Sequence, residues 1–331
     1  YISLTLFAFN SESIASNASF VDSGQVKILD TESKSVYPET LIYNDVLGKF
    51  FVGSVRYSAV YEIDKAGKYK QILKDDNLYS VMGIAVDGKR GKVFVTNSDL
   101  GVSVNSDYDG TLQVAGLGIY SLENGNKLAY HDLASLRPES EHFANGVTLD
   151  ANGNAYVTDS IAPVIYKVDT DNKATVFLEN SEFEGEGFNL NGIVYHPDGY
   201  LIAVKKSSGT LYKIPVDDPE AFSQIQITDR FVAGDGLVFI DEDEIVLISN
   251  NEEGVAANSA YIIKGTNDWQ SATLVSTFPL GDVYPTTGAV KDGKIHVIHS
   301  NLQVMRRSDE KDREALRLIP SIRQIGSISG N

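Results

Sequence analysis

The chain contains no cysteine, and its 331 residues include only one tryptophan and two methionines. The absence of cysteine excludes disulfide bonds, thiolate nucleophiles and cysteine-based zinc sites, and it leaves the cellular compartment open. Positive charge is also scarce, because 28 Lys and Arg face 45 Asp and Glu and give a net charge of −17. Nucleic acids and anionic membrane surfaces bind basic patches, so neither is an expected partner. Metal cations and small-molecule substrates are the expected ligands of such a chain.

Long hydrophobic runs are lacking too. The longest apolar stretch, Ile2 to Phe9, is far shorter than the roughly 20 residues that a membrane-spanning helix needs, so no membrane span is expected. This stretch and the small polar residues after it resemble the end of a secretory signal. Residues 1–24 are therefore interpreted as an N-terminal arm or signal remnant, and the secretory pathway is the expected localisation. A loosely packed arm is the alternative interpretation.

The apolar runs that are present have the length and composition of β-strands. Almost all are four to six residues long, rich in β-branched or aromatic residues, and bounded by Gly, Asn, Asp or Ser. One pattern of three strands recurs six times, with copies that begin at Glu39, Met82, Asn145, Asn191, Asp235 and Thr287. Units that repeat about every 50 residues in this way are typical of propeller blades. The sequence therefore predicts an all-β fold, a six-bladed β-propeller spanning residues 25–306.

Closure of the predicted ring depends on the sixth copy. A fourth strand follows the third in the first five copies, but none follows Leu302–Val304, the predicted third strand of copy six. The segment Gln25 to Leu29 has the missing pattern, so we expect this N-terminal strand to complete blade six and to close the ring. Residues 307–331 are predicted to form a C-terminal tail without an assigned role, and an insertion is predicted in blade two, around Asp99 to Gly116.

Ring symmetry turns sequence position into spatial position, so the residues at the heads of the six inner strands should converge on the axis. Four of these six residues carry carboxylate or amide oxygens: Glu39, Asn145, Asn191 and Asp235. Polar groups gathered in a narrow channel are costly unless something compensates them, and a hard cation would do so. A set made only of oxygen ligands suits Ca²⁺. The alternative interpretation is that the Asn-Gly and Asp-Gly pairs are simply turn dipeptides.

These motifs resemble those of the six-bladed, calcium-dependent hydrolases that include gluconolactonase/regucalcin, diisopropyl fluorophosphatase and, more distantly, the paraoxonases. The resemblance extends from Gln25 to about Met305 and implies four calcium ligands: Glu39 within Tyr37-Pro38-Glu39-Thr40, Asn145 within Phe143-Ala144-Asn145-Gly146, Asn191 within Asn189-Leu190-Asn191-Gly192, and Asp235 within Gly234-Asp235-Gly236-Leu237. It also implies that Asp235 and Asn145 are catalytic, with Asp235 as general base or nucleophile. The implied activity is calcium-dependent hydrolysis of a lactone, ester or phosphotriester, as in a lactonase or esterase.

The sequence also departs from the sugar-lactone branch of that family. Thr40-Leu41 stands where that branch usually has Gly-Pro, and Phe143 stands where it usually has Arg. The loss of the Arg indicates a less polar substrate than an aldonolactone, and the first blade looks closer to the calcium-dependent phosphotriesterase-like proteins.

Four further residues are predicted around the substrate pocket: His142, Phe143, Met82 and Thr287. For His142 two interpretations stay open, a proton shuttle at the rim of the pocket or an exposed loop residue. A hypothesis from another class also stays open, in which the chain is a non-catalytic binding propeller whose central calcium holds the blades together.

Overall fold

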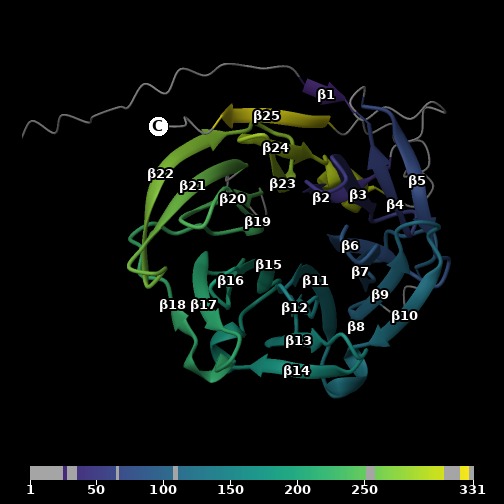
Figure 1. Cartoon of the computed structure of the whole chain (residues 1–331), viewed down its shortest axis with the longest axis horizontal. Coiled ribbons are helices and arrows are strands. Elements are labelled where there is room, and N and C mark those ends of the chain that lie inside the picture. Colours follow the sequence, from purple (N-terminus) through teal and green to yellow (C-terminus); the bar gives the residue numbers. More distant parts are fainter. Residues whose placement is uncertain are drawn as a thin grey trace, which may run out of the picture.

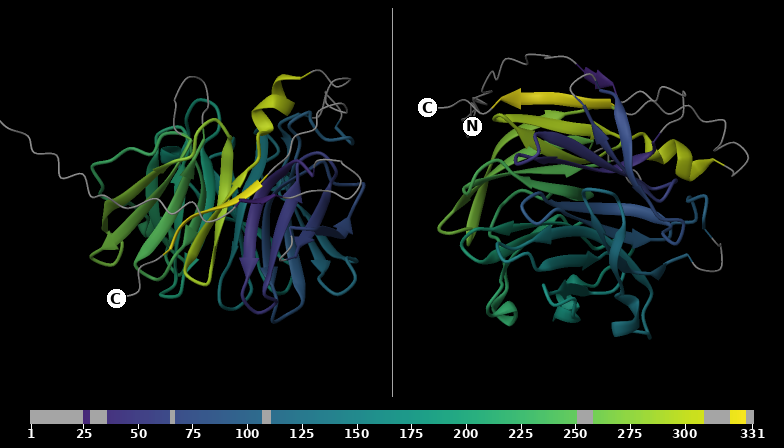
Figure 2. Two further views of the ribbon diagram at one scale, coloured as in Figure 1. Left: turned by 90° about the horizontal axis from the view of Figure 1, so that it is seen from above. Right: turned by 45° about the vertical axis from the view of Figure 1, so that its right-hand side comes forward.

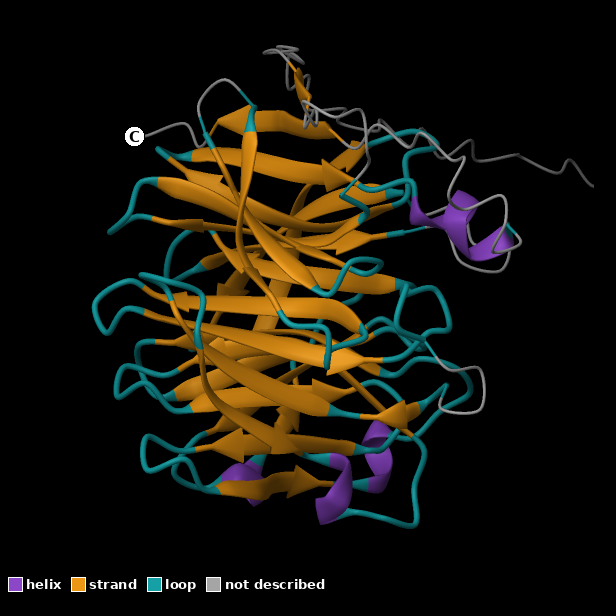
Figure 3. Cartoon of the chain, turned by 90° about the vertical axis from the view of Figure 1, so that its right-hand side faces the viewer, coloured by secondary structure: helices purple, strands orange, loops and turns teal. Residues whose placement is uncertain are grey.

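The computed structural model is a six-bladed β-propeller, as the repeat pattern predicts (Figure 1). The structure describes residues 25–27, 36–64, 67–106, 111–250, 258–308 and 321–327. The predicted arm, residues 1–24, lies outside the described residues. Six sheets, each built from antiparallel strands except for one short parallel pair, surround a central axis. Seen from the side, the strands of all the blades run across one thick disc (Figure 3).

Each blade is a sheet whose first strand lies next to the axis and whose last strand lies at the periphery (Figure 1). From the axis outward, blade one consists of β2 (Pro38–Asn44), β3 (Lys49–Ser54), β4 (Ala59–Ile63) and β5 (Tyr69–Lys74). Blade two consists of β6 (Ser80–Asp87), β7 (Lys92–Ser98), β9 (Gly116–Ser121) and β10 (Lys127–Asp132). Blade three consists of β11 (His142–Leu149), β12 (Ala155–Asp159), β13 (Val164–Val168) and β14 (Ala174–Glu179). Blade four consists of β15 (Leu190–His196), β16 (Tyr200–Lys205), β17 (Thr210–Pro215) and β18 (Ser223–Gln224). Blade five consists of β19 (Gly234–Phe239), β20 (Glu244–Ser249), β21 (Ser259–Thr266) and β22 (Ser271–Pro279).

Burial on both faces explains why the second strands contain runs of consecutive apolar residues. In β16 every residue from Tyr200 to Lys205 is buried, because both faces of the sheet pack on a neighbouring blade. The blades join through shared apolar clusters, such as the one in which Phe51 of blade one packs with Val81 and Val93 of blade two. This stacking of sheets removes apolar surface from water all around the ring.

Blade six closes the ring, but its strands differ from the prediction. Its order from the axis outward is β23 (Pro285–Lys291), β24 (Lys294–His299), β25 (Ser321–Ser327) and β1 (Gln25–Lys27). The predicted N-terminal outer strand is confirmed, since Val26 of β1 pairs with Ile322 of β25. The third strand comes from the predicted tail 307–331, which therefore contributes to the propeller.

The prediction of a third strand at Leu302–Val304 is wrong, because this segment begins α1 (Leu302–Arg307). Leu302 and Met305 are both buried, and side chains three apart share one face of a helix but not of a strand. The helix projects from one face of the disc (Figure 2). Neither α1 nor any other helix in the described part of the chain could span a bilayer.

The predicted insertion of blade two connects its second and third strands, β7 and β9. It contains β8 (Gln113–Val114), which pairs in parallel with the start of β11 and so extends the sheet of blade three. Short 3₁₀ turns connect some of the other strands: η2 (Ala134–Leu136), η3 (Ser181–Phe183) and η4 (Pro219–Ala221). The insertion therefore fastens blade two to blade three.

Truncation tests the closure. Removal of residues 1–24 keeps β1, whereas removal through Asp30 deletes β1 and exposes the edge of β25. Truncation after residue 320 deletes β25 itself, which separates β24 from β1. We expect melting temperatures to fall in the order full chain, deletion through Asp30, truncation after 320, with deletion of 1–24 matching the full chain. Equal melting of all variants would contradict this closure.

Candidate functional site at the propeller axis

The inner strands carry β-bulges at the same level around the axis. In blade three, Asn145 and Gly146 lie between the pairs Ala144–Asp159 and Val147–Val157, so two residues oppose one on the second strand. The equivalent first bulge residues in the other blades are Glu39, Met82, Asn191, Asp235 and Thr286. We call these six residues the axial ring. The bulges turn the four predicted oxygen-bearing residues toward one centre.

The structure corrects the sixth ring position by one residue. The bulge of blade six contains Thr286 and Thr287, and Thr286 comes first. Thr286 lines the same cavity as the rest of the ring, whereas Thr287 takes the place that glycine has in blades two to five. The sequence prediction placed Thr287 in the ring because Gly288 was matched with the glycines of the other repeats.

The glycines that follow four ring residues have a packing role, and the turn interpretation of these dipeptides is wrong. All four lie within inner strands. A Cβ on Gly146 would lie 2.5 Å from the carbonyl oxygen of Asn191 in the next blade. A Cβ on Gly83 or Gly192 would likewise meet the carbonyl oxygen of the next ring residue. Glycine is needed because the inner strands approach each other too closely for a side chain.

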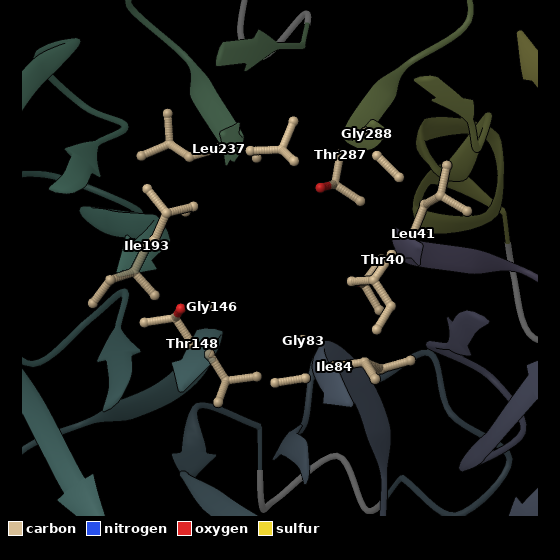
Figure 4. A pocket seen from close by; sticks show the side chains of 18 of the residues that line it. Thr40, Leu41, Gly83, Ile84, Gly146, Thr148, Ile193, Leu237, Thr287 and Gly288 are labelled. Carbon is tan, nitrogen blue, oxygen red and sulfur yellow. The ribbon is translucent and has the colours of Figure 1, made fainter. Parts of the chain in front are cut away.

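The axial ring lies between two cavities. One is a central channel of about 390 Å³ along the axis, lined by inner-strand residues such as Thr40, Ile84, Thr148, Ile193 and Leu237 (Figure 4). The other is a smaller cavity of about 50 Å³, which we call the capped pocket because side chains of α1 line it. Both cavities are lined by the same five ring residues: Glu39, Met82, Asn145, Asn191 and Asp235.

The walls of the capped pocket are mostly apolar. Phe143, Phe188 and Tyr284 supply aromatic surface, and Leu302 and Met305 of α1 cover it. Phe143 and Phe188 pack edge to face with their ring centroids 5.1 Å apart. Phe143 and Met82, two of the residues predicted around a substrate pocket, both line this cavity. A polar floor beneath apolar walls suits a ligand with one polar group on an apolar body.

Asp235 is held by two polar side chains that sequence reasoning missed. The Lys206 Nζ lies 3.0 Å from Asp235 Oδ2 and 2.8 Å from Asn250 Oδ1. The Asn250 amide also donates to Asp235 Oδ2. Each of the two directly follows a second strand, β16 or β20, and that shared position was the signal that could have identified them. These contacts fix the position of the Asp235 carboxylate and place a positive charge beside it.

The other three oxygen-bearing ring residues differ in how they are held. Asn145 Nδ2 donates to Ser160 Oγ at 3.0 Å, which orients the amide. Among the described residues, no side chain forms a hydrogen bond or ion pair with the Glu39 carboxylate or the Asn191 amide. Glu39 and Asn191 are only 7% and 5% exposed, so these polar groups are buried at the boundary between the two cavities.

The pKa of Glu39 reflects this environment. Burial raises it well above its usual range, the nearby Asp235 carboxylate raises it further, and the Lys206 ammonium offsets part of the rise. A buried carboxylate without a donor is a costly group, which a bound cation would stabilise.

His142 does not take either of the predicted roles. It lines neither the capped pocket nor the central channel, and it is only 2% exposed. Its Nδ1 lies 2.9 Å from Asp159 Oδ2, and its Nε2 lies 2.8 Å from the carbonyl oxygen of Arg137. Burial lowers the pKa of His142, but these two acceptors outweigh it and the net shift is upward. The residue therefore fastens the start of β11 to β12.

The donor set of the ring fits a hard cation. Two carboxylates and two amides supply oxygen atoms without sulfur or imidazole, which is the ligand chemistry of calcium. No cluster of three or more His, Asp or Glu side chains suited to a metal occurs in the described part of the chain. A cation at the ring would therefore depend on Asn145 and Asn191 as well as on Glu39 and Asp235.

Comparison of the whole chain with solved structures finds the same propeller fold. The chain is similar to the major allergen Mala s 1 of Malassezia sympodialis, with a TM-score of 0.71, 16% identity and coverage of 93% of this chain and 97% of that one. It is similar to a luciferin-regenerating enzyme, with a TM-score of 0.59, 14% identity and coverage of 92% and 96%. A PQQ-bound aldose sugar dehydrogenase from Streptomyces coelicolor gives a TM-score of 0.58, 14% identity and coverage of 93% and 98%.

These structural neighbours include enzymes, and at such identities they show the fold alone. No protein-family model and no curated protein matches the chain.

The raised pKa of Glu39 predicts how stability depends on pH in chelator-treated protein. The contribution of Glu39 to the free energy of unfolding is fully present below the pKa of a glutamate in the unfolded chain. This contribution is lost as the pH rises through the pKa of Glu39 in the folded protein. The free energy of unfolding should therefore fall by up to about 1.4 kcal/mol per pH unit in that interval. Glu39→Gln should remove this component, as measured by urea unfolding across pH 4–8. An unchanged pH profile in Glu39→Gln would contradict the assignment.

Proposed function

We propose that this protein is a calcium-dependent hydrolase that acts on a lactone, ester or phosphotriester with a largely apolar body. Glu39, Asn145, Asn191 and Asp235 are the proposed calcium ligands. The observation that carries the proposal is the buried carboxylate of Glu39, which receives no hydrogen bond from a side chain in the described part of the chain and lies in a ring of oxygen ligands at the floor of an apolar pocket. The enzymes among the structural neighbours show that propellers of this fold support catalysis, and they give no substrate for this chain.

The chain's own residues divide the work of such a reaction. Phe143, Phe188 and Tyr284 surround the apolar body of the substrate and exclude water from the capped pocket. Asn145, oriented by Ser160, presents a neutral oxygen. A calcium ion bound at the ring would polarise the carbonyl or phosphoryl oxygen of the substrate and stabilise its developing negative charge.

Asp235 takes the chemical role in this proposal. It removes a proton from the water that attacks the carbonyl carbon or, with a phosphotriester, attacks the phosphorus directly. The P–O bond to the leaving alcohol then breaks, and water hydrolyses the aspartyl phosphate ester that has formed. The ion pair with Lys206 holds the carboxylate in a fixed direction at the floor of the pocket. Glu39 acts only as a ligand.

The metal part of the proposal predicts about one tightly bound Ca²⁺ per chain. An ion that binds only the folded ring stabilises it by mass action, by about 2.7 kcal/mol at 100 times its Kd. Calcium should therefore raise the melting temperature of the chelator-treated protein by several degrees, and metal analysis should return calcium. Zinc in that analysis, or no metal after calcium loading, would refute the ligand assignment.

Two substitutions separate chemistry from metal binding. Asp235→Asn keeps the size and a coordinating oxygen but removes the charge and basicity, so turnover should fall about 100-fold or more even at saturating calcium. Glu39→Gln should weaken calcium binding, and added calcium should largely restore its turnover. The measurement is calcium-dependent hydrolysis of aliphatic lactones, aldonolactones, aryl esters and phosphotriesters, with melting temperature as the control for folding.

The outcomes also distinguish an enzyme from a binding propeller. Full turnover of Asp235→Asn at saturating calcium would exclude Asp235 as base or nucleophile. Calcium binding by the wild type without hydrolysis of any substrate in the panel would favour the non-catalytic propeller with a structural calcium.

A further inference from the structure

In each of blades two to six, one residue of the second strand lies opposite the bulge of the inner strand. The residue two positions later in the sequence, at the end of the second strand or just after it, occupies an equivalent place in the different blades. The residues at this place are Ser98, Ser160, Lys206, Asn250 and Ser300. All except Lys206 are uncharged and short. Ser98 and Ser160 each donate a hydrogen bond to a carbonyl oxygen of the next blade. A serine would make such a contact, so packing between blades does not explain a lysine in blade four.

Lys206 ends on a proposed calcium ligand of the neighbouring blade. It is 5% exposed, and its Nζ lies 3.0 Å from Asp235 Oδ2. It lines the capped pocket with the ring residues, and it is not part of the described lining of the central channel. Its electrostatic influence also reaches Glu39, whose pKa it lowers.

The preceding residue, Lys205, provides a natural contrast. It is also nearly buried, at 9% exposure, but its Nζ donates to the backbone carbonyl oxygens of Glu182 and Glu184. Two adjacent buried lysines thus differ in their partners, since one ends on backbone groups of the segment that connects blades three and four and the other reaches Asp235 of the axial ring.

We propose that Lys206 is a resident counter-cation of the axial ring, which neutralises Asp235 when no metal is bound and competes with a divalent cation for that carboxylate. This inference rests on the proposed metal site. Two buried carboxylates converge on the ring, and the loss of one partner of a buried ion pair leaves an uncompensated charge. An ammonium and a divalent cation on the same carboxylate repel each other, so Lys206 lowers the affinity of the ring for metal.

Calcium titration of the full-length chain by calorimetry tests the competition. Wild type, Lys206→Met and the matched control Lys205→Met are stripped with chelator and titrated with Ca²⁺ alone. We expect Lys206→Met to bind calcium roughly 10-fold more tightly or better, because a positive charge next to the ion has been removed. Lys205→Met should match the wild type. Lys206→Gln serves if Lys206→Met does not fold.

Melting temperatures provide a second readout, because the effect of the substitution should differ between chelator and saturating calcium. A purely structural role of Lys206 would not give this difference. In chelator, Lys206→Met should melt below the wild type, because Asp235 loses its counter-charge beside Glu39. With saturating calcium, its gain in melting temperature should exceed that of the wild type. A lysine needed only for packing would lower both melting temperatures equally.

The outcomes separate this inference from the proposed function. Equal calcium affinities in wild type and Lys206→Met would overturn the inference and leave the proposed hydrolase intact. Binding by Lys206→Met alone would support the competition and refute a resident calcium in the natural protein. No binding in any variant would overturn the metal site, and the inference with it.

Discussion

Closure of the ring is the constraint on which the rest of the structure depends. Each blade packs its apolar faces on two neighbours, and blade six can do so only if β25 joins β24 and β1 joins β25. Residues near both ends of the chain are thereby held in one sheet, and the apolar cluster between blades six and one, which includes Leu41, Ile298 and Ile322, becomes complete. Only a closed ring brings six inner strands to one axis, and only then do the ring residues face one another.

The approach of the inner strands has both a structural and a chemical consequence. Neighbouring strands lie so close that glycine is required after four of the ring residues. The bulges that accommodate this approach turn the preceding side chains toward the axis. The packing that stabilises the propeller therefore also concentrates two carboxylates and two amides in a small buried volume. Such an arrangement needs positive charge. Lys206 supplies part of it through its ion pair with Asp235, while no described side chain donates a hydrogen bond to the Glu39 carboxylate.

The charge of the site differs from that of the molecule as a whole. The chain carries a net charge of −17, but the capped pocket is lined by Lys206 and Arg306 together with Glu39 and Asp235. Acidic side chains elsewhere are solvated at low cost, whereas each charge at the ring is shielded from water and must be balanced locally. The electrostatic balance of the ring accordingly depends on a few named groups.

The sequence by itself determined the all-β class, the six blades, the N-terminal closing strand and the convergence of Glu39, Asn145, Asn191 and Asp235. These follow from local strand patterns and from repetition, which fixes equivalent positions. Tertiary structure decided what repetition could not show. Leu302 and Met305 form a helix because they pack over the capped pocket, and a strand from the predicted tail enters blade six. His142 is buried against Asp159, and Lys206 reaches across to Asp235 of the next blade. Each of these depends on contacts between segments distant in sequence, and a local pattern carries no information about the partner that a side chain will meet.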